Sequence, residues 1–311
     1  MDPVTHAVIG MAVSKLSGNG IVMSNPMTIG IIAGAVFPDI DIVMQKWGDY
    51  AYLKNHRGVT HSIPGIAVSA LIISAILKVI FPTVNMLELY LWSALGGLSH
   101  AFIDLFNSYG AKLLWPVIKK RFSLSLLLTF DPFLLGLLGG YILSGNVLQN
   151  IFIGLVPVYL AVRAIMRLGS TRGLVKIFGS DFKSISLLPS LSGFFRWHFI
   201  LETDRYNIVG EKNMLCRGVR IIKKLDKLPD EALDKVVVSQ VGEFFSEFTP
   251  LSHIACEKNG SIKRYIFIDM RYYIRDNFLH HAVLEMDKNN RIVKQSFNPY
   301  SMKRSCPIAM Y

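Results

Sequence analysis

Cysteine is scarce in this sequence of 311 residues, which contains only three. Cys216, Cys256 and Cys306 are odd in number and widely spaced, so they indicate neither a disulfide framework nor a paired-cysteine metal site. Such sparse usage is typical of a reducing compartment. The sequence also lacks internal repeats with a period of about 20–50 residues, which excludes solenoid and propeller folds.

Charge is scarce in the first part of the chain. Residues 1–168 contain 11 Lys and Arg and 7 Asp and Glu, whereas residues 169–311 contain 22 and 15. A typical soluble domain is about 25% charged, a share that the second part reaches and the first does not. We therefore predict two domains, a membrane-embedded one at 1–168 and a soluble one at 169–311.

The first part is rich in long apolar runs. A helix needs about 20 apolar residues to cross a bilayer core, and four runs have this length: 62–82, 87–106, 124–143 and 147–165. Two shorter runs, 4–16 and 27–38, predict a helical hairpin that dips into the membrane or packs against the other helices. The predicted fold is an all-α multi-pass membrane helical bundle with four spans and this N-terminal hairpin. A large soluble helical protein with a very apolar core is the alternative.

The soluble part predicts a small α+β domain with a mainly antiparallel sheet. Residues 195–209, 215–222, 263–274, 278–286 and 291–297 have strand-like composition, and Asp287-Lys-Asn-Asn290 is typical of a hairpin turn. Residues 229–248 contain a helical stretch. This domain could regulate the membrane part or bind a protein partner.

Lys and Arg residues predict the orientation in the membrane. They precede the first long run, separate the second from the third and follow the fourth, whereas residues 82–86 and 144–150 carry no charge. Cytoplasmic loops are rich in Lys and Arg, so we expect a protein of the cytoplasmic membrane with its C-terminal domain in the cytoplasm. The net charge of +11 is then mainly a topology signal, and nucleic acid is not an expected partner.

Histidine and aspartate are the chemically informative residues of the apolar part. His100 and Asp104 are four residues apart, which places them on one face of a helix and suits either a metal ion or a structural pair. The further candidates are His6, Asp39, Asp41, His56, His61 and Asp131. Each also has a structural interpretation, such as a helix cap for Asp39 and a cap or a pairing with Arg121 for Asp131. In the predicted topology all of them fall in one layer at the cytoplasmic end of the spans, enough for two metal ions.

The order of these motifs resembles a known family. Asp-Pro-x-Thr-His at 2–6, Pro-Asp-x-Asp at 38–41, His-Arg-Gly-x-Thr-His-Ser at 56–62 and Gly-x-x-Ser-His-x-x-x-Asp at 96–104 look like the bacterial membrane-bound metal-dependent hydrolases. Asn-Ser-Tyr-Gly at 107–110 and Lys-Arg-Phe-Ser at 120–123 extend the likeness over about residues 1–170. This family, of the LexA-binding inner-membrane hydrolase type, is remotely similar to zinc-dependent phospholipase C and fungal zinc nucleases.

The resemblance implies a metal-dependent site. Its motifs carry over as metal ligands the residues His6, Asp39, His56, His61, His100 and Asp104. Mixed His and carboxylate ligands suit zinc, with manganese or iron as alternatives, and one to two or more ions are expected. Asp41 or Asp131 would take a proton from a metal-activated water, and Arg57 would hold an anionic oxygen. Arg57 could instead be a positive-inside anchor.

The function expected from these features is hydrolysis of a phosphoester or lipid-linked substrate at the cytoplasmic membrane interface. An alternative from another class is a non-catalytic membrane scaffold or regulator whose soluble domain binds a protein or DNA. A transporter is the third hypothesis, because His and Asp within spans can form an ion pathway.

Overall fold

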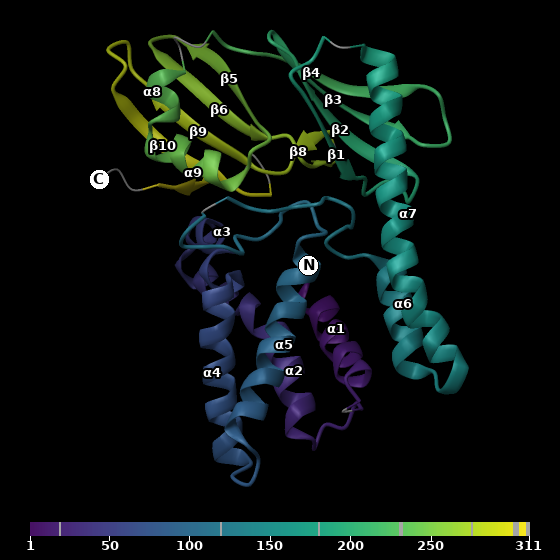
Figure 1. Cartoon of the computed structure of the whole chain (residues 1–311). Coiled ribbons are helices and arrows are strands. Elements are labelled where there is room, and N and C mark those ends of the chain that lie inside the picture. The colour runs from purple at the N-terminus through teal and green to yellow at the C-terminus, as the bar shows by residue number, and fades with distance from the viewer. Residues whose placement is uncertain are drawn as a thin grey trace. The chain divides into compact units, whose positions relative to one another are not determined.

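A computed structural model of the chain (Figure 1) describes all residues except 19, 119, 180, 230–232, 275, 301–304 and 309–311. The chain forms two compact units. Residues 1–43 and 55–166 make up the first, and residues 44–54 and 167–311 the second.

The first unit is helical. Its helices are α1 (Pro3–Leu16), α2 (Pro26–Val36), α4 (Ile63–Ile80), α5 (Met86–Asp104), α6 (Pro132–Leu143) and α7 (Asn146–Phe178), and α7 continues into the second unit. Two 3₁₀ helices, η1 (Phe37–Trp47) and η2 (Val59–His61), connect them, with η1 also continuing into the second unit. Side chains of Asp2, Asn25, Ser62 and Asp131 cap the starts of α1, α2, α4 and α6, each followed by proline in the first turn.

Helices α2 and α5 approach each other through small residues. A Cβ atom on Gly34 would lie 2.0 Å from the carbonyl oxygen of Ser93, and one on Gly96 would lie 2.0 Å from that of Ile31. Only glycine allows backbones this close, as in other tightly packed membrane helices. The contact holds the residues that follow α2 beside the last turns of α5.

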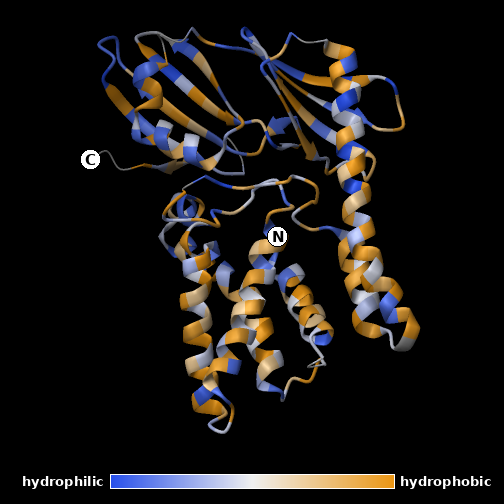
Figure 2. Ribbon diagram, in the orientation of Figure 1, coloured by the Kyte–Doolittle hydropathy of each residue, from blue (hydrophilic) through white to orange (hydrophobic). Residues whose placement is uncertain are grey.

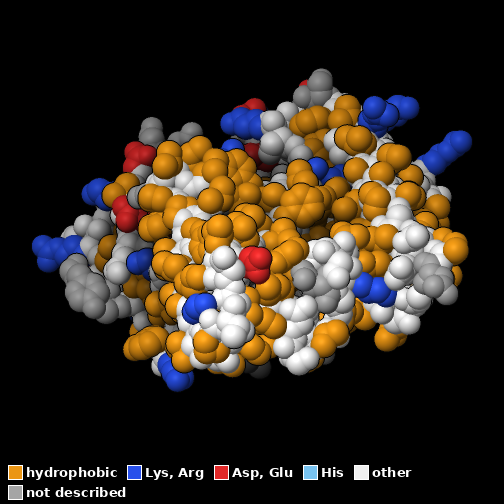
Figure 3. Space-filling model, turned by 60° about the horizontal axis from the view of Figure 1, so that its bottom comes forward, with side chains coloured by type: hydrophobic (Ala, Val, Ile, Leu, Met, Phe, Trp, Pro, Cys, Tyr) orange, Lys and Arg blue, Asp and Glu red, His pale blue; other side chains and the backbone are white. Residues whose placement is uncertain are grey.

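Three described helical segments are long and apolar enough to cross a membrane: Pro26–Trp47, Ile63–Ile80 and Val147–Phe178. Many of their apolar side chains are exposed. Figure 2 shows the hydropathy of these helices, and apolar side chains predominate on the face in Figure 3. The run expected to span at 124–143 is helical only as α6, whose 12 residues give a length of about 18 Å. The residues before it form a loop, in which Leu124 and Leu126 donate backbone hydrogen bonds to Leu105 and Phe106.

The second unit is an α+β domain with antiparallel sheets, as expected. One sheet has the order β1 (Ser184–Pro189), β2 (Arg196–Glu202), β3 (Tyr206–Asn213), β4 (Val219–Asp226). The other has the order β11 (Cys306–Pro307), β10 (Ile292–Asn298), β9 (His281–Met286), β6 (Ile262–Asp269), β5 (Ser252–Asn259). A hairpin of β7 (Tyr273–Ile274) and β8 (Asn277–Phe278) and the helices α8 (Asp234–Val237) and α9 (Gln240–Phe248) complete it.

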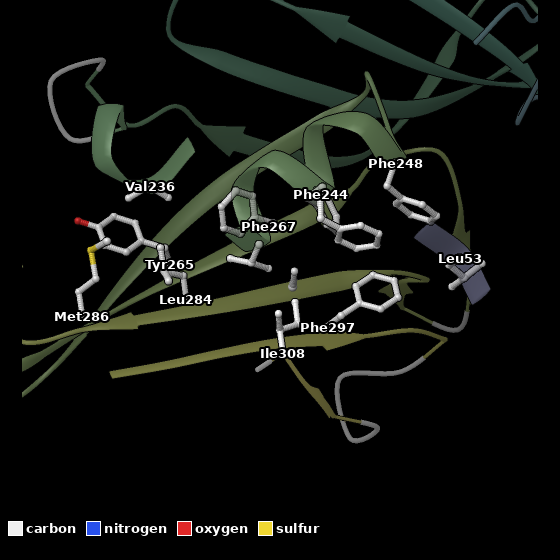
Figure 4. Packing of buried hydrophobic residues seen from close by; sticks show 13 residues of the cluster. Leu53, Val236, Phe244, Phe248, Tyr265, Phe267, Leu284, Met286, Phe297 and Ile308 are labelled. Carbon is white, nitrogen blue, oxygen red and sulfur yellow. The ribbon is translucent and has the colours of Figure 1, made fainter. Parts of the chain in front are cut away.

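A short piece of the N-terminal part of the sequence belongs to this second unit. Helix α3 (Asp49–Asn55) places Leu53 in the same hydrophobic cluster as Phe248 and Phe297 (Figure 4). The ring centroids of Tyr50 and Phe244 lie 4.7 Å apart. Residues 44–54 are therefore anchored in the C-terminal core, although candidate site residues precede and follow them in the sequence.

Candidate metal centre

Two 3₁₀ helices, η1 and η2, and the end of α5 position the candidate ligands of the first unit. Asp39 and Asp41 lie on η1 directly after α2, His61 ends η2, and His100 and Asp104 occupy the last turns of α5. All five side chains are buried, and His61, His100 and Asp104 are completely so. An apolar protein buries such groups only when they are paired or bound to an ion.

Four atoms of these side chains form a ring. Nε2 of His61 lies 3.4 Å from Oδ1 of Asp39 and 3.6 Å from Oδ2 of Asp104. Nε2 of His100 lies 3.8 Å and 3.7 Å from the same two oxygens. We call these four atoms the four-atom ring.

The edges of the four-atom ring are close to the ligand spacing of a metal ion, and three of its residues, His61, His100 and Asp104, offer ligand atoms that all lie within 4.8 Å of one another. Ligand atoms about 2.0–2.2 Å from a tetrahedral zinc lie about 3.4 Å from one another. All four atoms are buried and have no hydrogen-bond partner within the described chain. Buried polar atoms without partners are costly, so both the geometry and the donor set fit a divalent metal.

Neighbouring groups orient the two imidazoles of the ring. Nδ1 of His100 lies 2.7 Å from the carbonyl oxygen of Ala35, and Nδ1 of His61 lies 3.0 Å from the hydroxyl of Thr60. Such bonds fix the ring orientation of metal-binding histidines and direct the other nitrogen to the ion. Ala35 is the penultimate residue of α2, so the tight α2–α5 contact supplies this support.

A second group shares Asp39 with the ring. Asp39, Asp41 and His56 each offer one ligand atom, all within 4.8 Å of one another. Nδ1 of His56 lies 2.9 Å from Oδ1 of Asp41, whose other oxygen accepts a hydrogen bond from the Arg57 amide. Burial lowers the pKa of His56, which favours the neutral imidazole that binds metals.

His6 lies on the other side of His100. Their rings stack with centroids 3.5 Å apart, and Nε2 of His6 lies 3.5 Å from Oδ1 of Asp104. The amino group of Met1 also contacts His6 and Asp104. His6, Asp39 and His100 form a third set with metal-ligand spacing.

The comparisons with known proteins place the chain in a family. Residues 1–170, more than half of the chain, match the family described as YdjM inner membrane protein. The chain belongs to the YdjM family. It is also 30% identical over 302 residues to the "Uncharacterized protein YfhP" of Bacillus subtilis (strain 168), covering 92% of this chain and 91% of that protein. Residues 231–305 match the YfhP C-terminal alpha/beta plait domain, and no solved structure matches the chain.

The expectation of a membrane protein is therefore confirmed for this YdjM-family chain by its family and by its apolar helices. The C-terminal part is confirmed as an α/β domain, of the plait type.

Arg57 is buried beside the four-atom ring. Its Nε lies 3.6 Å from Oδ2 of Asp104, and its Nη1 donates to Oδ1 of Asn107 over 2.7 Å. Its backbone has φ of 60°, a left-handed conformation that is strained for a residue with a side chain. Arg57 is therefore buried and paired with Asp104 and Asn107, and it does not lie at the protein surface.

Asn107 is a site residue that the sequence-based reasoning missed. Its Nδ2 donates to Oδ1 of Asp104 over 2.8 Å, so it bridges Arg57 and the four-atom ring. The available signal was its place in the Asn-Ser-Tyr-Gly motif, three residues after Asp104.

Asp131 lies outside the three ligand groups found among the described residues. It caps α6 through the amide of Leu134, and both of its oxygens accept the hydroxyl of Tyr159 over 2.9 Å. Asp131 is thus a helix cap, which was one of the structural interpretations of this residue. The other candidate residues lie together in the structure.

Proposed function

We propose that this chain is a membrane-bound metal-dependent hydrolase that holds one ion at the four-atom ring. The observation that carries the proposal is the convergence of four buried atoms that have no hydrogen-bond partner among the described residues, with neighbouring atoms 3.4 to 3.8 Å apart. Zinc suits these ligands, with manganese or iron as alternatives. The group of Asp39, Asp41 and His56 would hold a second ion, with Asp39 between the two.

With His61, His100 and Asp104 as its protein ligands, the ion would keep a position open for water, as catalytic zinc sites do, and would supply Lewis acidity and an activated water. When only the ion of the ring is bound, Asp41 is not a ligand and would accept the proton of that water on its carboxylate, whose two oxygens are held by Nδ1 of His56 and the Arg57 amide. The guanidinium of Arg57 would bind an anionic substrate oxygen, since Asn107 fixes one of its nitrogens next to the ring. This donor arrangement favours a phosphoester or lipid-linked phosphoester as substrate.

The proposal includes a topology in which the polypeptide enters and leaves the membrane part on the cytoplasmic side. In it α4 and α5 cross as one hairpin and α6 and α7 as another, with the bilayer thinned locally around the 12-residue α6. This gives the four spans expected from the apolar runs and leaves the basic loops in the cytoplasm. The C-terminal domain and the metal centre would then face the same compartment.

The decisive experiment is metal analysis of the purified full-length protein. We expect near-stoichiometric divalent metal in the wild type and its loss in the double variant His100→Ala/Asp104→Ala. The control is His253→Gln, which changes a buried histidine of the second unit. A folded, monodisperse wild type that binds no divalent metal would refute the proposal.

Activity assays separate a hydrolase from a scaffold. We expect the metal-loaded wild type to hydrolyse members of a panel of phosphomonoesters and phosphodiesters, and the double variant to be at least about 100-fold slower, since even loss of a group that supports a metal ligand costs about 10–100-fold. Metal binding without hydrolysis of any phosphoester would favour the non-catalytic scaffold.

A further inference from the structure

A groove opens beside the metal centre on the outer face of α4. It has a volume of about 290 Å³, and its lining is almost entirely apolar. Its walls include Phe37, Val59, Thr60, Val68, Ile72 and Trp115, all of which belong to the first unit.

One wall of the groove touches the site directly. The hydroxyl of Thr60 lies 3.0 Å from Nδ1 of His61 and 3.4 Å from Oδ2 of Asp41. Phe37, on another wall, precedes Asp39 by two residues. The end of the groove at Thr60 is therefore next to the proposed metal ligands.

The turn that carries Thr60 is pressed against α4. A Cβ atom on Gly65 would lie 1.9 Å from the carbonyl oxygen of Val59, so only glycine permits this approach. The side chain of Ser62 also caps α4 through the amide of Gly65. This local packing fixes the position of Thr60, at one end of the groove, relative to His61.

The far end of the groove follows a membrane span. The 18 residues of α4 have a mean hydropathy of 2.3, and only 33% of them are buried within the protein. Val68 and Ile72 lie on its exposed face. In a bilayer the medium around this face is hydrocarbon, so the occupant of an apolar groove that opens there is an acyl chain and not water.

We propose that this groove binds one acyl chain of a membrane lipid, and that this lipid is the substrate of the metal centre. The inference rests on the proposed hydrolase function and names its substrate class, a phosphoester lipid whose head group is reached from the bilayer. The acyl chain would lie along Val68 and Ile72, and the phosphate would face Thr60, the metal ligands and the buried Arg57.

The test fills the groove without touching the metal ligands. Val68→Trp and Ile72→Trp add bulk on the exposed face of α4, where a larger side chain does not disturb the core. The matched control is Val79→Trp, on the same helix and 80% exposed but outside the groove. Each variant is compared with wild type for its rate on dioleoyl-phosphatidylglycerol in nanodiscs and on water-soluble bis(p-nitrophenyl) phosphate.

We expect the ratio of the lipid rate to the soluble rate to fall by at least about tenfold in Val68→Trp and Ile72→Trp, because several methylene groups lose their site. Val79→Trp should keep the wild-type ratio. Groove variants that keep this ratio as well would overturn the lipid groove while leaving the hydrolase function standing.

A second readout does not depend on catalysis. Native mass spectrometry should detect one retained phospholipid on the wild type and on Val79→Trp, and less on the two groove variants. If the wild type retains the lipid through the groove but hydrolyses no phosphoester, the proposed function fails and the lipid site stands. If wild type and groove variants retain lipid equally, or none at all, the groove proposal is wrong.

Discussion

Single side chains decide the character of the metal centre. Asp39, His61, His100 and Asp104 each direct one atom to the four-atom ring. The second polar atom of His100, His61 and Asp104 is supported by Ala35, Thr60 and Asn107, respectively. The supports are backbone carbonyls, hydroxyls and amides, none of which competes strongly for the metal. The ring atoms themselves have no such support within the described chain, so the ion is expected to contribute to stability.

Removal of the metal should therefore destabilise the first unit. An ion that binds the folded state alone adds about 2.7 kcal/mol when present at 100 times its dissociation constant. We expect a strong chelator to lower the melting temperature of the detergent-solubilised wild type and added zinc to restore it. The variant His100→Ala/Asp104→Ala should show no response to either treatment, and a wild type that melts identically with and without chelator would contradict this.

At the scale of helices, glycine contacts assemble the site. Gly34 and Gly96 allow α2 to touch α5, which brings Asp39 to within reach of His100. Gly65 does the same for η2 and α4 and so positions His61. The ligands come from separate elements, so the site depends on how closely these elements pack.

Gly96→Ala tests this dependence. The added methyl group would lie 2.0 Å from the Ile31 carbonyl oxygen, which forces α2 and α5 apart. We expect metal binding to be lost or weakened at least about tenfold, with a cost of about 1–3 kcal/mol in stability typical of overpacking. Gly136→Ala is the control, because its methyl group meets nothing within 4 Å and alanine favours a helix. Equal metal affinity in both variants would show that the contact is not needed.

Leu53→Ala tests the anchoring of α3 in the C-terminal core. Leu53 is buried among aromatic side chains of the second unit (Figure 4), and truncation of a buried leucine costs about 2–5 kcal/mol. We expect faster hydrogen exchange in α9 and β10, measured by mass spectrometry on the full-length protein. Val238→Ala, at an exposed position of the same unit, should leave exchange unchanged. An equal response to both substitutions would argue against the anchor.

At the scale of the whole molecule, the two units carry different kinds of buried charge. The first gathers histidines and carboxylates around a metal centre. The second buries His253, His280 and His281 without metal-ligand groups among its described residues. Desolvation lowers the pKa of each to about 4, although Asp226 and Asp269 oppose the shift.

These histidines predict how the stability of the second unit depends on pH. Their pKa is lower in the folded state than the value of about 6.5 in the unfolded chain, so the unfolded state binds protons first on acidification. Their contribution is complete above about pH 6.5 and decreases as the pH falls toward 4, by up to about 1.4 kcal/mol per pH unit for each histidine. Hydrogen exchange of β6 and β9 at pH values between 7.5 and 4.5 measures this, corrected for the intrinsic exchange rate.

The variant His253→Gln/His281→Gln provides the comparison for this pH dependence. It removes two of the three histidines whose pKa is about 4, so its stability should fall less steeply on acidification than that of the wild type. A wild-type stability that stays constant or rises on acidification would contradict the prediction.

The amino-acid sequence by itself determined the division into an apolar helical part and a charged α+β part, because apolar runs, charge density and turn residues are local properties. It also pointed to the histidines and aspartates of the metal centre, because their residue types and short spacings are visible without a fold. Its apolar runs predicted four spans, and two of them, 62–82 and 147–165, match described segments that meet the length and hydropathy of a span. The runs 87–106 and 124–143 do not match such a segment, and the second of them begins as a loop. The third segment, Pro26–Trp47, contains the run 27–38 that was predicted as part of a hairpin, because η1 continues directly from α2.

Only the tertiary structure decided which atoms meet. Asp39 reaches His100 through a backbone contact between two helices, Asn107 bridges Arg57 to Asp104, and Asp131 caps a helix instead. The packing of residues 44–54 with the C-terminal core is likewise absent from any local pattern. These features join residues far apart in the chain, and they depend on how closely backbones approach and which buried atoms lack partners, neither of which periodicity or composition encodes.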